Sequence, residues 1–364
     1  MTLKPKILDR YIVTKFLTTF LIALLVVILL VIIFDISEKI ENFVQHEVPL
    51  KSIVFDYYVN FIPYFINMFS PLFVFITVIF FTSRMAANSE IIAILSGGIS
   101  YHRMMVPYMF SAAIIAMLSL ILNLFIIPRS NFERVDFETK YVDQSYTKYS
   151  RNNVHYQIAP GQFVYVQTFS AYNNTAYKFT LETIEDNKLV SKLTAESATW
   201  DSTMDGWHLR RYFIRDYTKG LEDYVEVGDK KDTVIALKLN DFYRNQKTVE
   251  TLTRDELNSL IETQEMRGDA NVMYALIERN KRYTLPFSAF ILTIMAVSLT
   301  SRKKRGGIGF NLALGIGLAF LYILFLRFSE MFVYTGTLPA GLAMWLPNIV
   351  YTIIAAVLYR LAPK

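Results

Sequence analysis

The residues that could do chemistry in this chain are few, and their spacing fits no common catalytic or metal-binding pattern. The four histidines, His46, His102, His155 and His208, are scattered and lack the spacing of metal ligands. There is no cysteine, which excludes disulfides and cysteine-ligated metal centres. No G-x-x-x-x-G-K-[ST] or G-x-G-x-x-G run is present, so no phosphate-binding loop for a nucleotide is expected. We therefore predict no catalytic residue, no metal and no bound cofactor.

One acid is notable for its setting. Glu90 lies in the stretch TSRMAANSEIIAILSGGIS (82–100), between two long apolar segments. The preceding Asn88-Ser89 pair is typical of a helix cap, and Gly97-Gly98 is typical of a helix stop. A short helix held between two membrane spans could act as a lever for a partner, with Glu90 as a polar contact beside an apolar face. The alternative is an amphipathic loop helix at the lipid headgroups, with Glu90 solvated.

The elements that position this stretch are membrane spans. The chain has 364 residues, 53% of them hydrophobic, and a mean hydropathy of +0.30, which is typical of a membrane protein. A spanning helix needs about 20 apolar residues. Uncharged runs of about that length predict six helices, over residues 16–34, 57–83, 104–128, 283–301, 306–326 and 331–359. The first run ends without a signal-peptide cleavage site, so we expect it to remain as an anchor.

Lysine and arginine in the short loops predict the orientation. Loop 35–56 is acidic, with only Lys39 and Lys51 as basic residues, which favours the outer side. The segments expected in the cytoplasm are 1–15, 84–103, 302–305 and 360–364, so both chain ends are predicted to be cytoplasmic. The segments expected outside are 35–56, 129–282 and 327–338. The net charge of +5 is assigned to the cytoplasmic loops and gives no reason to expect nucleic acid as a partner.

The predicted membrane cores contain no Asp, Glu, Lys, Arg or His. Transporters driven by protons or sodium usually need such groups inside the membrane. If this protein moves a substrate, we therefore expect a partner to supply the energy.

The central segment has a different character. Runs rich in β-branched and aromatic residues, separated by turn-forming residues, occur at 162–166, 176–184, 189–200 and 207–217. They predict an inserted all-β domain, a sandwich or jellyroll. A short helix over 251–268 follows, with a capping box at Thr253 and Glu256 and a stop at Gly268. The predicted domains are 1–128 (three spans), 129–268 (β domain and return helix) and 269–364 (three spans).

Several stretches together resemble the LptF/LptG permease family of the lipopolysaccharide exporter. They are LDRYIVTKF before the first span, SRMAANSEIIAILSGGIS after the second, IIPRSNFERV after the third and TLTRDELNSLI before the fourth. The resemblance covers essentially the whole chain, and the LDRYI stretch favours the LptG type over the LptF type. It implies a helical membrane protein with six spans and a periplasmic β-jellyroll-like domain, in the inner membrane of a Gram-negative bacterium.

The resemblance also implies partners. These are a paralogous LptF/LptG-type permease, an LptB-like ATPase dimer that uses ATP, an LptC-like periplasmic bridge protein and lipopolysaccharide itself. The stretch around Glu90 matches the coupling helix of the family, which docks into a groove of the ATPase. The residues expected to make this contact are Arg84, Ser89, Glu90, Ile91, Leu95, Gly97 and Gly98.

A phosphorylated lipid needs cations at the outer mouth of its cavity, where arginine can grip phosphate bidentately and lysine acts as a point charge. The candidates are Lys39, Arg129, Arg134 and Arg327, followed by Lys281 and Arg282. The alternative is that these residues are interfacial anchors whose charged ends reach the headgroups, and Arg327 could pair with Glu330 on one helix face. The first span ends with only Lys39, where the family often has another basic residue, which indicates either that the first span lacks the phosphate contact of the family or that the headgroup has fewer phosphates.

The family also implies that the first and fifth helices form gates. Gly309, Gly315 and Gly317 in the fifth helix predict close approach of a neighbouring helix or ordinary small-residue packing. Two other functions remain open. One is a protein that transmits the motion of an ATPase without moving lipid. The other is an envelope-lipid enzyme that would need clustered acids, for which Glu38 and Glu41 are candidates but look more like solvated charge.

Overall fold

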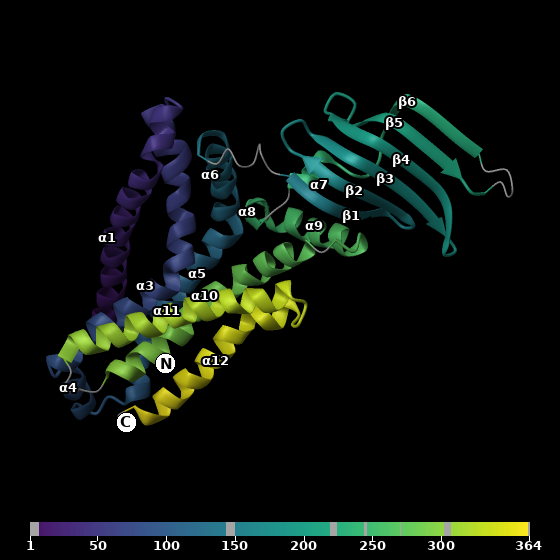
Figure 1. The fold of residues 1–364 in the computed structure, drawn as a ribbon. Coiled ribbons are helices and arrows are strands. Elements are labelled where there is room, and N and C mark those ends of the chain that lie inside the picture. The colour runs from purple at the N-terminus through teal and green to yellow at the C-terminus, as the bar shows by residue number, and fades with distance from the viewer. Residues whose placement is uncertain are drawn as a thin grey trace. The chain divides into compact units, whose positions relative to one another are not determined.

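The computed structural model describes residues 7–142, 150–218, 224–243, 246–269, 271–301 and 307–362 (Figure 1). The chain divides into two compact units. The helical unit comprises Met1–Arg134 and Leu276–Lys364, and the β unit comprises Val135–Ala275. The basic residues Lys4, Lys6, 302–305 and Lys364, which contributed to the predicted orientation, lie outside the described residues.

Long helices make up the helical unit, and six helical stretches among the described residues are long and apolar enough to cross a membrane. The prediction of six spans is therefore confirmed. The helices are α1 (Ile7–Gln45), α2 (Leu50–Ser52), η1 (Ile53–Tyr58, a π-helical turn), α3 (Val59–Ala87), α4 (Glu90–Ser96), α5 (Tyr101–Ile121), η2 (Leu122–Ile126, also π-helical), α6 (Ile127–Tyr141), α10 (Val272–Thr300), α11 (Gly307–Tyr334) and α12 (Ala340–Leu361).

The helices extend well beyond the apolar runs that predicted them. Helix α1 continues to Gln45 and α2 begins at Leu50, so the predicted loop 35–56 is helical over most of its length. Helix α11 likewise continues through most of the predicted loop 327–338. The reason is local charge pairing: Lys39 lies 2.7 Å from Asp35 one turn earlier on α1, and such pairs support a helix beyond its apolar part.

Polar side chains connect the helices inside the bundle. Helix α3 packs against both α1 and α11. The amide of Asn67 on α3 donates to Asn123 Oδ1 over 2.8 Å, and Ser119 Oγ donates to Asn67 Oδ1 over 2.6 Å. Asn311 on α11 donates to Ser83 Oγ on α3 over 3.1 Å. Such contacts matter in a membrane because lipid provides no hydrophobic drive for helix association.

Of the three glycines expected to allow close helix packing, one does so. A Cβ atom at Gly315 would meet the side chain of Ile79 on α3, so this glycine sets the approach of α11 to α3. At Gly309 and Gly317 a Cβ would meet nothing within 4 Å. Within this chain, no neighbouring helix therefore approaches these two glycines closely.

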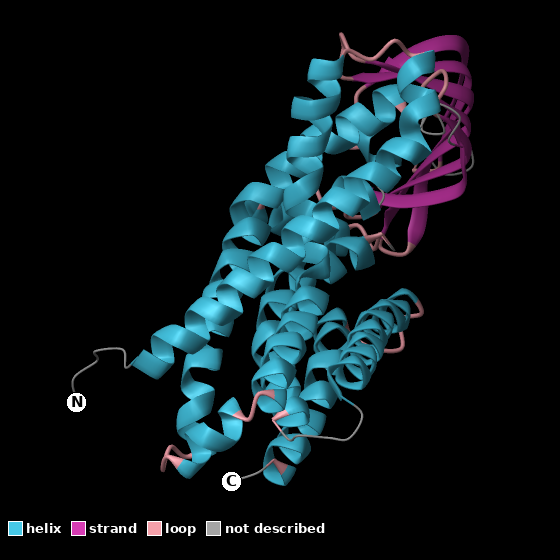
Figure 2. Ribbon diagram, turned by 90° about the vertical axis from the view of Figure 1, so that its left-hand side faces the viewer, coloured by secondary structure: helices cyan, strands magenta, loops and turns pink. Residues whose placement is uncertain are grey.

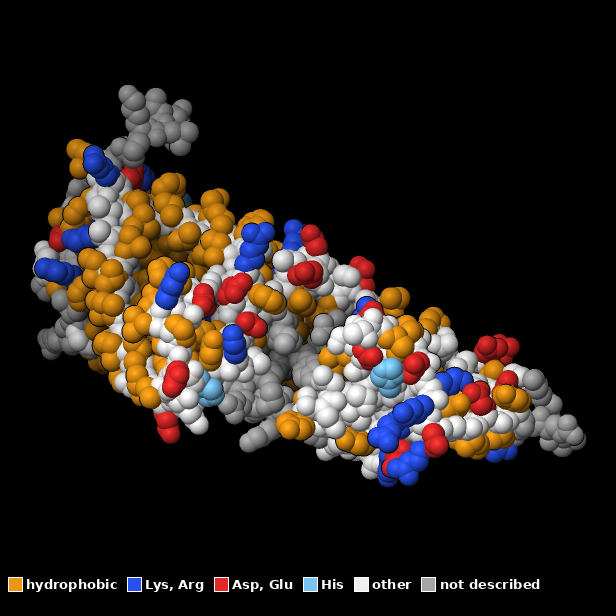
Figure 3. Space-filling model, turned by 90° about the horizontal axis from the view of Figure 1, so that it is seen from above, with side chains coloured by type: hydrophobic (Ala, Val, Ile, Leu, Met, Phe, Trp, Pro, Cys, Tyr) orange, Lys and Arg blue, Asp and Glu red, His pale blue; other side chains and the backbone are white. Residues whose placement is uncertain are grey.

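The outside of the helical unit is largely apolar. In Figure 3 apolar side chains cover most of its visible surface, whereas the visible surface of the β unit mixes charged, polar and apolar groups. Leu21, Leu25 and Leu29 on α1 are all more than half exposed and follow one another at one-turn spacing. Exposed apolar faces on long helices are what a lipid environment stabilises.

The β unit contains one six-stranded antiparallel sheet, magenta in Figure 2, with the strands in sequence order, β1-β2-β3-β4-β5-β6 (Figure 1). The predicted all-β insertion is confirmed, and its strands form a single-sheet meander, so a two-sheet sandwich is not what the described strands make. The strands are β1 (Ser150–Ala159), β2 (Gln162–Ser170), β3 (Thr175–Glu185), β4 (Lys188–Asp201), β5 (Gly206–Asp216) and β6 (Tyr224–Thr233).

An aromatic core lies on one face of this sheet. Trp207 is fully buried, and its indole N–H donates to the carbonyl of Leu237 over 2.8 Å. Phe242, on the short helix α7 (Leu239–Tyr243), stacks on Phe169 with ring centroids 4.2 Å apart. Two further helices follow, α8 (Gln246–Val249) and α9 (Arg254–Met266). The predicted helix start at Thr253 is confirmed, because Glu256 accepts a hydrogen bond from the Thr253 N–H over 2.8 Å.

Candidate functional site

The stretch around Glu90 forms a two-turn helix, α4, between α3 and α5. Its predicted stop is confirmed: Gly98 has φ +83°, its N–H donates to Leu95 O over 3.1 Å, and the N–H of Ile99 donates to Ile94 O over 3.4 Å. This pair of bonds is a Schellman motif, which needs a left-handed residue that glycine supplies without strain. The predicted side-chain cap is wrong. Ser89 sits at the cap position with φ +63° and its side chain makes no cap hydrogen bond.

Glu90 is bonded to the first helix of the chain. Its Oε2 accepts a hydrogen bond from the Tyr11 hydroxyl over 2.8 Å and lies 3.8 Å from Lys15 Nζ. Lys15 also donates to the Tyr11 hydroxyl. Partial burial raises the pKa of Glu90, but the hydrogen bonds from Tyr11 and Asn88 and the charges of Lys15 and Arg84 together outweigh it, and the net pKa is lowered. The carboxylate is therefore charged at neutral pH and connects α4 to α1.

A second contact reinforces this connection. The guanidinium of Arg103, at the start of α5, forms two hydrogen bonds of 2.7 Å with the carboxylate of Asp9 on α1. Within α4 itself, Ile91 is buried and Leu95 half-buried, whereas Ile92 is 52% exposed. Arg84, just before α4, is exposed. The helix thus presents one face to the bundle and leaves Arg84, Ile92 and the edge of Glu90 accessible.

Three of the predicted rim cations lie along one face of η1 and α3. Lys39 on α1 is 2.7 Å from Asp35 and its ammonium lies 4.5 Å from the ring centre of Tyr57. The Tyr58 hydroxyl also donates to Asp35, over 3.0 Å. Asp35 thus fixes the position of Lys39 beside an aromatic ring.

The second cation is Arg134 on α6, which is buried. Its guanidinium carbon lies 4.5 Å from the ring centre of Tyr64, and its Nε donates to Asn131 Oδ1 over 3.2 Å. A cation over an aromatic face is stabilised by the ring quadrupole.

The third cation is Arg327 on α11. It pairs with Glu330 over 3.1 Å, as the sequence predicted, and its Nη2 lies 3.9 Å from the sulfur of Met68. Lys281 on α10 approaches the same carboxylate to 3.9 Å. Glu330 therefore brings together two cations that lie on different helices.

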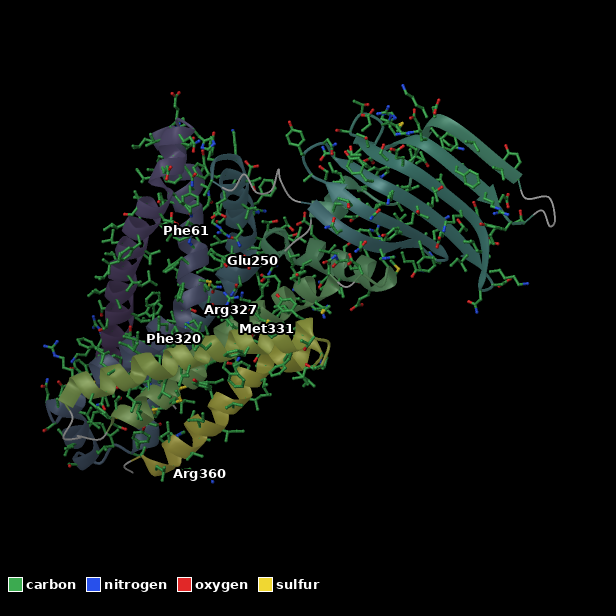
Figure 4. The ribbon with its side chains drawn as sticks, in the orientation of Figure 1. Phe61, Glu250, Phe320, Arg327, Met331 and Arg360 are labelled. Carbon is green, nitrogen blue, oxygen red and sulfur yellow. The ribbon has the colours of Figure 1, made fainter. Side chains whose placement is uncertain are left out.

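The side chains that receive these cations form a stripe on one helix face. We call Tyr57, Phe61, Tyr64 and Met68 the α3 stripe, since their spacing of three to four residues places them one above another. Phe61 stacks on Tyr57, with ring centroids 5.7 Å apart. Figure 4 labels Phe61 on α3 and Arg327 on α11. The sequence contains this spacing, but only the structure shows which cations face it.

The remaining two candidates are Arg282 and Arg129. Arg282 is buried and pairs with Glu278 one turn earlier on α10, over 2.9 Å. Arg129 is exposed. Glu38 and Glu41, the acids considered for an enzyme, are both exposed on α1. Among the described residues, no three His, Asp or Glu side chains are grouped so that they could hold a metal ion.

A sequence model of the family described as lipopolysaccharide export system permease LptF/LptG matches residues 10–361, nearly the whole chain. The chain belongs to the LptF/LptG family. No curated protein matches it significantly. The members of the LptF/LptG family are permeases, that is, transport subunits. With its six candidate spans, this chain is a multi-pass membrane protein. The family description covers both types, so the LptG-type assignment stays a prediction.

Proposed function

We propose that this chain is one half of a permease pair that extracts lipopolysaccharide from the bacterial inner membrane. A partner related to LptB hydrolyses ATP, and an LptC-like bridge protein receives the lipid. An even number of spans, six here, supports a topology with both chain ends on one side, and the loop charges favour the cytoplasm for that side. In this proposal α4 lies in the cytoplasm and the β unit in the periplasm. The family match supports the general role.

The observation that carries the coupling step is the contact between Glu90 and α1. Tyr11 and Lys15 hold the Glu90 carboxylate while its edge remains accessible. A cation of the ATPase can then share or replace these partners, since a half-exposed carboxylate accepts several donors. Movement of the ATPase would reach α3 and α5 through the backbone of α4, and α1 through Glu90.

The α3 stripe supports the lipid-binding step. Phe61 and Tyr64 are half-buried and offer an apolar surface, whereas Tyr57 is buried. Lys39, Arg134 and Arg327 lie beside the stripe at three heights, with Arg134 buried. Asp35 and Glu330 neutralise two of these cations before a lipid arrives. A lipid phosphate would therefore compete with a carboxylate for Lys39 and Arg327, which allows binding and release without leaving a bare charge in the membrane. Arg129, which is exposed, offers a further contact.

The lipid then passes to the β unit and on to the bridge protein. The mechanism is sideways entry of the lipid from the outer leaflet, collapse of the cavity between the two permeases when the ATPase closes, and transfer to the periplasmic sheet. The strands β1 and β6 are the edges of that sheet. Strand edges can pair with a strand of a neighbouring protein, which is how a continuous bridge would form.

Photo-crosslinking in cells tests both steps at once. A crosslinkable amino acid at Ile92 leaves Glu90 in place and should capture a cytoplasmic ATPase, whereas the same residue at the exposed Leu50 should not. A crosslinkable amino acid at Phe61 should capture lipopolysaccharide, visible as a ladder of bands on a gel. The same amino acid at the exposed Ile354 on α12 should not capture it.

Two results would contradict the proposal. Capture of the ATPase at Ile92 with no lipopolysaccharide at Phe61 would favour a protein that transmits ATPase motion without moving lipid. No capture at Ile92 would show that α4 is a loop helix lying on the membrane.

A further inference from the structure

A cavity of about 380 Å³ lies between α5, α10 and α12, away from the α3 stripe. It is at the end of the bundle that carries α4. His102 is the second residue of α5, which directly follows α4, and Arg360 is close to the end of α12 (Figure 4). The Tyr101 hydroxyl donates to Ser298 near the end of α10 over 3.3 Å, which brings these helix ends together. The volume is within the range of small-molecule sites in proteins.

The walls of this cavity are apolar. They are formed mainly by Met105, Met109, Ile291, Ile294, Ala355 and Ala356. Ala356 and Thr352, on the α12 wall, are exposed, so the cavity opens on the outer surface of the bundle. In a membrane that surface meets lipid, and an apolar cavity open to lipid favours an acyl chain over water.

The polar groups are concentrated at one end of the cavity. Arg360 and His102 are both exposed there, and His102 Nδ1 lies 3.2 Å from the Tyr359 hydroxyl. No acidic side chain is among the described residues that line the cavity. A positive charge with neutral hydrogen-bonding neighbours and no acid suits a phosphate.

We propose that this cavity binds one anionic phospholipid, with an acyl chain between α5, α10 and α12 and the phosphate on Arg360. Basic pockets between transmembrane helices commonly take anionic headgroups in this way. The apolar walls favour a lipid over free phosphate, and the cation favours an anionic lipid over a zwitterionic one. The site is separate from the proposed lipopolysaccharide path. The cavity is at the end of the bundle that carries α4, and in the proposed orientation this end faces the cytoplasmic leaflet. Only this choice of leaflet rests on the proposed function.

The test measures lipid binding to the purified, delipidated full-length chain in neutral detergent. Phosphatidylglycerol and phosphatidylcholine with the same acyl chains are titrated separately, and bound lipids are counted by native mass spectrometry. Arg360→Gln should weaken phosphatidylglycerol binding about fivefold and leave phosphatidylcholine unchanged, since one basic residue contributes about that much at a membrane surface. Ala356→Trp, which fills the opening, should weaken both.

Arg10→Gln is the matched control, because Arg10 is an exposed cation on α1 and does not line the cavity. It should bind both lipids as the unmodified chain does. Inorganic phosphate at millimolar concentration should not displace phosphatidylglycerol. Equal loss of phosphatidylglycerol in Arg10→Gln and Arg360→Gln would overturn the proposal, because the effect would then be one of general surface charge. Unchanged binding in Ala356→Trp would show that the cavity holds no lipid. Arg360→Gln changes only an exposed side chain, so its result stands even if Ala356→Trp fails to fold.

Discussion

The ion pairs around Asp35 and Glu330 in the helical unit are more deeply buried than most ion pairs of the β unit, whereas the Lys15–Glu90 pair near α4 is 30% and 29% exposed. In the helical unit the Lys281–Glu330 pair has side chains that are 9% and 6% exposed. In the β unit the side chains of Arg211 and Glu196 are 71% and 52% exposed. The partly buried Arg267–Asp241 pair, between α9 and α7, is an exception in the β unit.

Two buried acids of the helical unit are each shared by several partners. Asp35 accepts hydrogen bonds from Lys39, Tyr57 and Tyr58, and Glu330 faces both Arg327 and Lys281. Away from water, a charge must be balanced by several fixed donors, whereas an exposed pair is screened by solvent and salt. The comparison therefore predicts that loss of Asp35 or Glu330 costs much more stability than loss of an exposed ion pair in the β unit.

The largest effect should come from Glu330→Leu. This change leaves Lys281 and Arg327 without the carboxylate that they share, and breaking a buried ion pair from one side costs about 3–5 kcal/mol. Thermal and denaturant unfolding of the purified full-length chain in detergent measures the loss. The double variant Lys281→Met with Glu330→Leu should recover most of it, because it removes the buried charge together with its partner. Equal losses in the single and double variants would show that charge balance is not the cause.

Asp35→Asn should have the next largest effect, a loss of about 2 kcal/mol, since a buried hydrogen bond to a charged group contributes about that much. It also separates structure from function. If Lys39 binds lipid phosphate, Asp35→Asn removes the carboxylate that competes with the phosphate and should increase lipopolysaccharide capture at Phe61, while Lys39→Met should reduce capture. A fall in capture with both variants, in proportion to their loss of stability, would assign Lys39 a structural role only.

Much of this arrangement follows from the sequence. Long uncharged runs predict the spans because a helix must satisfy its own backbone in lipid. The Gly98 turn, the Thr253 helix start and the Arg327–Glu330 pair depend only on near neighbours, and all three are confirmed.

Other features depend on packing between distant segments. The contact between Tyr11 and Glu90 joins residues 79 positions apart, and no local pattern marks Tyr11 as a partner. The α3 stripe has a regular spacing, but cations reach it from three different helices. The extension of α1 to Gln45 was missed because Asp35 and Lys39, read singly, look like the end of a span, whereas together they neutralise each other on one helix face.

A smaller and pH-dependent effect is expected at His208 in the β unit. Its Nδ1 lies 2.5 Å from Asp232 Oδ1 and its Nε2 lies 2.8 Å from Asp201 Oδ2, and these hydrogen bonds raise the pKa of His208. The stability that charged His208 contributes is fully present below its unfolded pKa of about 6.5 and is lost as pH rises through the higher folded value. Hydrogen bonds from Thr203 and then His208 lower the pKa of Asp201 to about 2. The stability that the Asp201 carboxylate contributes is therefore present above its unfolded pKa and is lost only as the pH falls through about 2.

His208→Gln should therefore be less stable than the parent below about pH 6.5 and about as stable as the parent at higher pH. Its free energy of unfolding should no longer fall as the pH rises through the folded pKa of His208. In a Trp345→Phe background the remaining tryptophans, Trp200 and Trp207, both lie in the β unit and report its unfolding in the full-length chain. The same slope in His208→Gln as in the parent would assign the pH dependence to another group.

The smallest effect is expected for Arg211→Gln, which breaks the exposed pair with Glu196 on the neighbouring strand β4. Arg211 has φ +47°, a left-handed conformation that costs arginine and glutamine about equally. The substitution therefore isolates the charge, and an exposed pair contributes about 0–1 kcal/mol. Raising the salt concentration should reduce the difference in unfolding free energy between Arg211→Gln and the parent. It should change the effect of Glu330→Leu little, since buried charges are weakly screened. A large, salt-insensitive loss in Arg211→Gln would mean that burial is not what separates the two units.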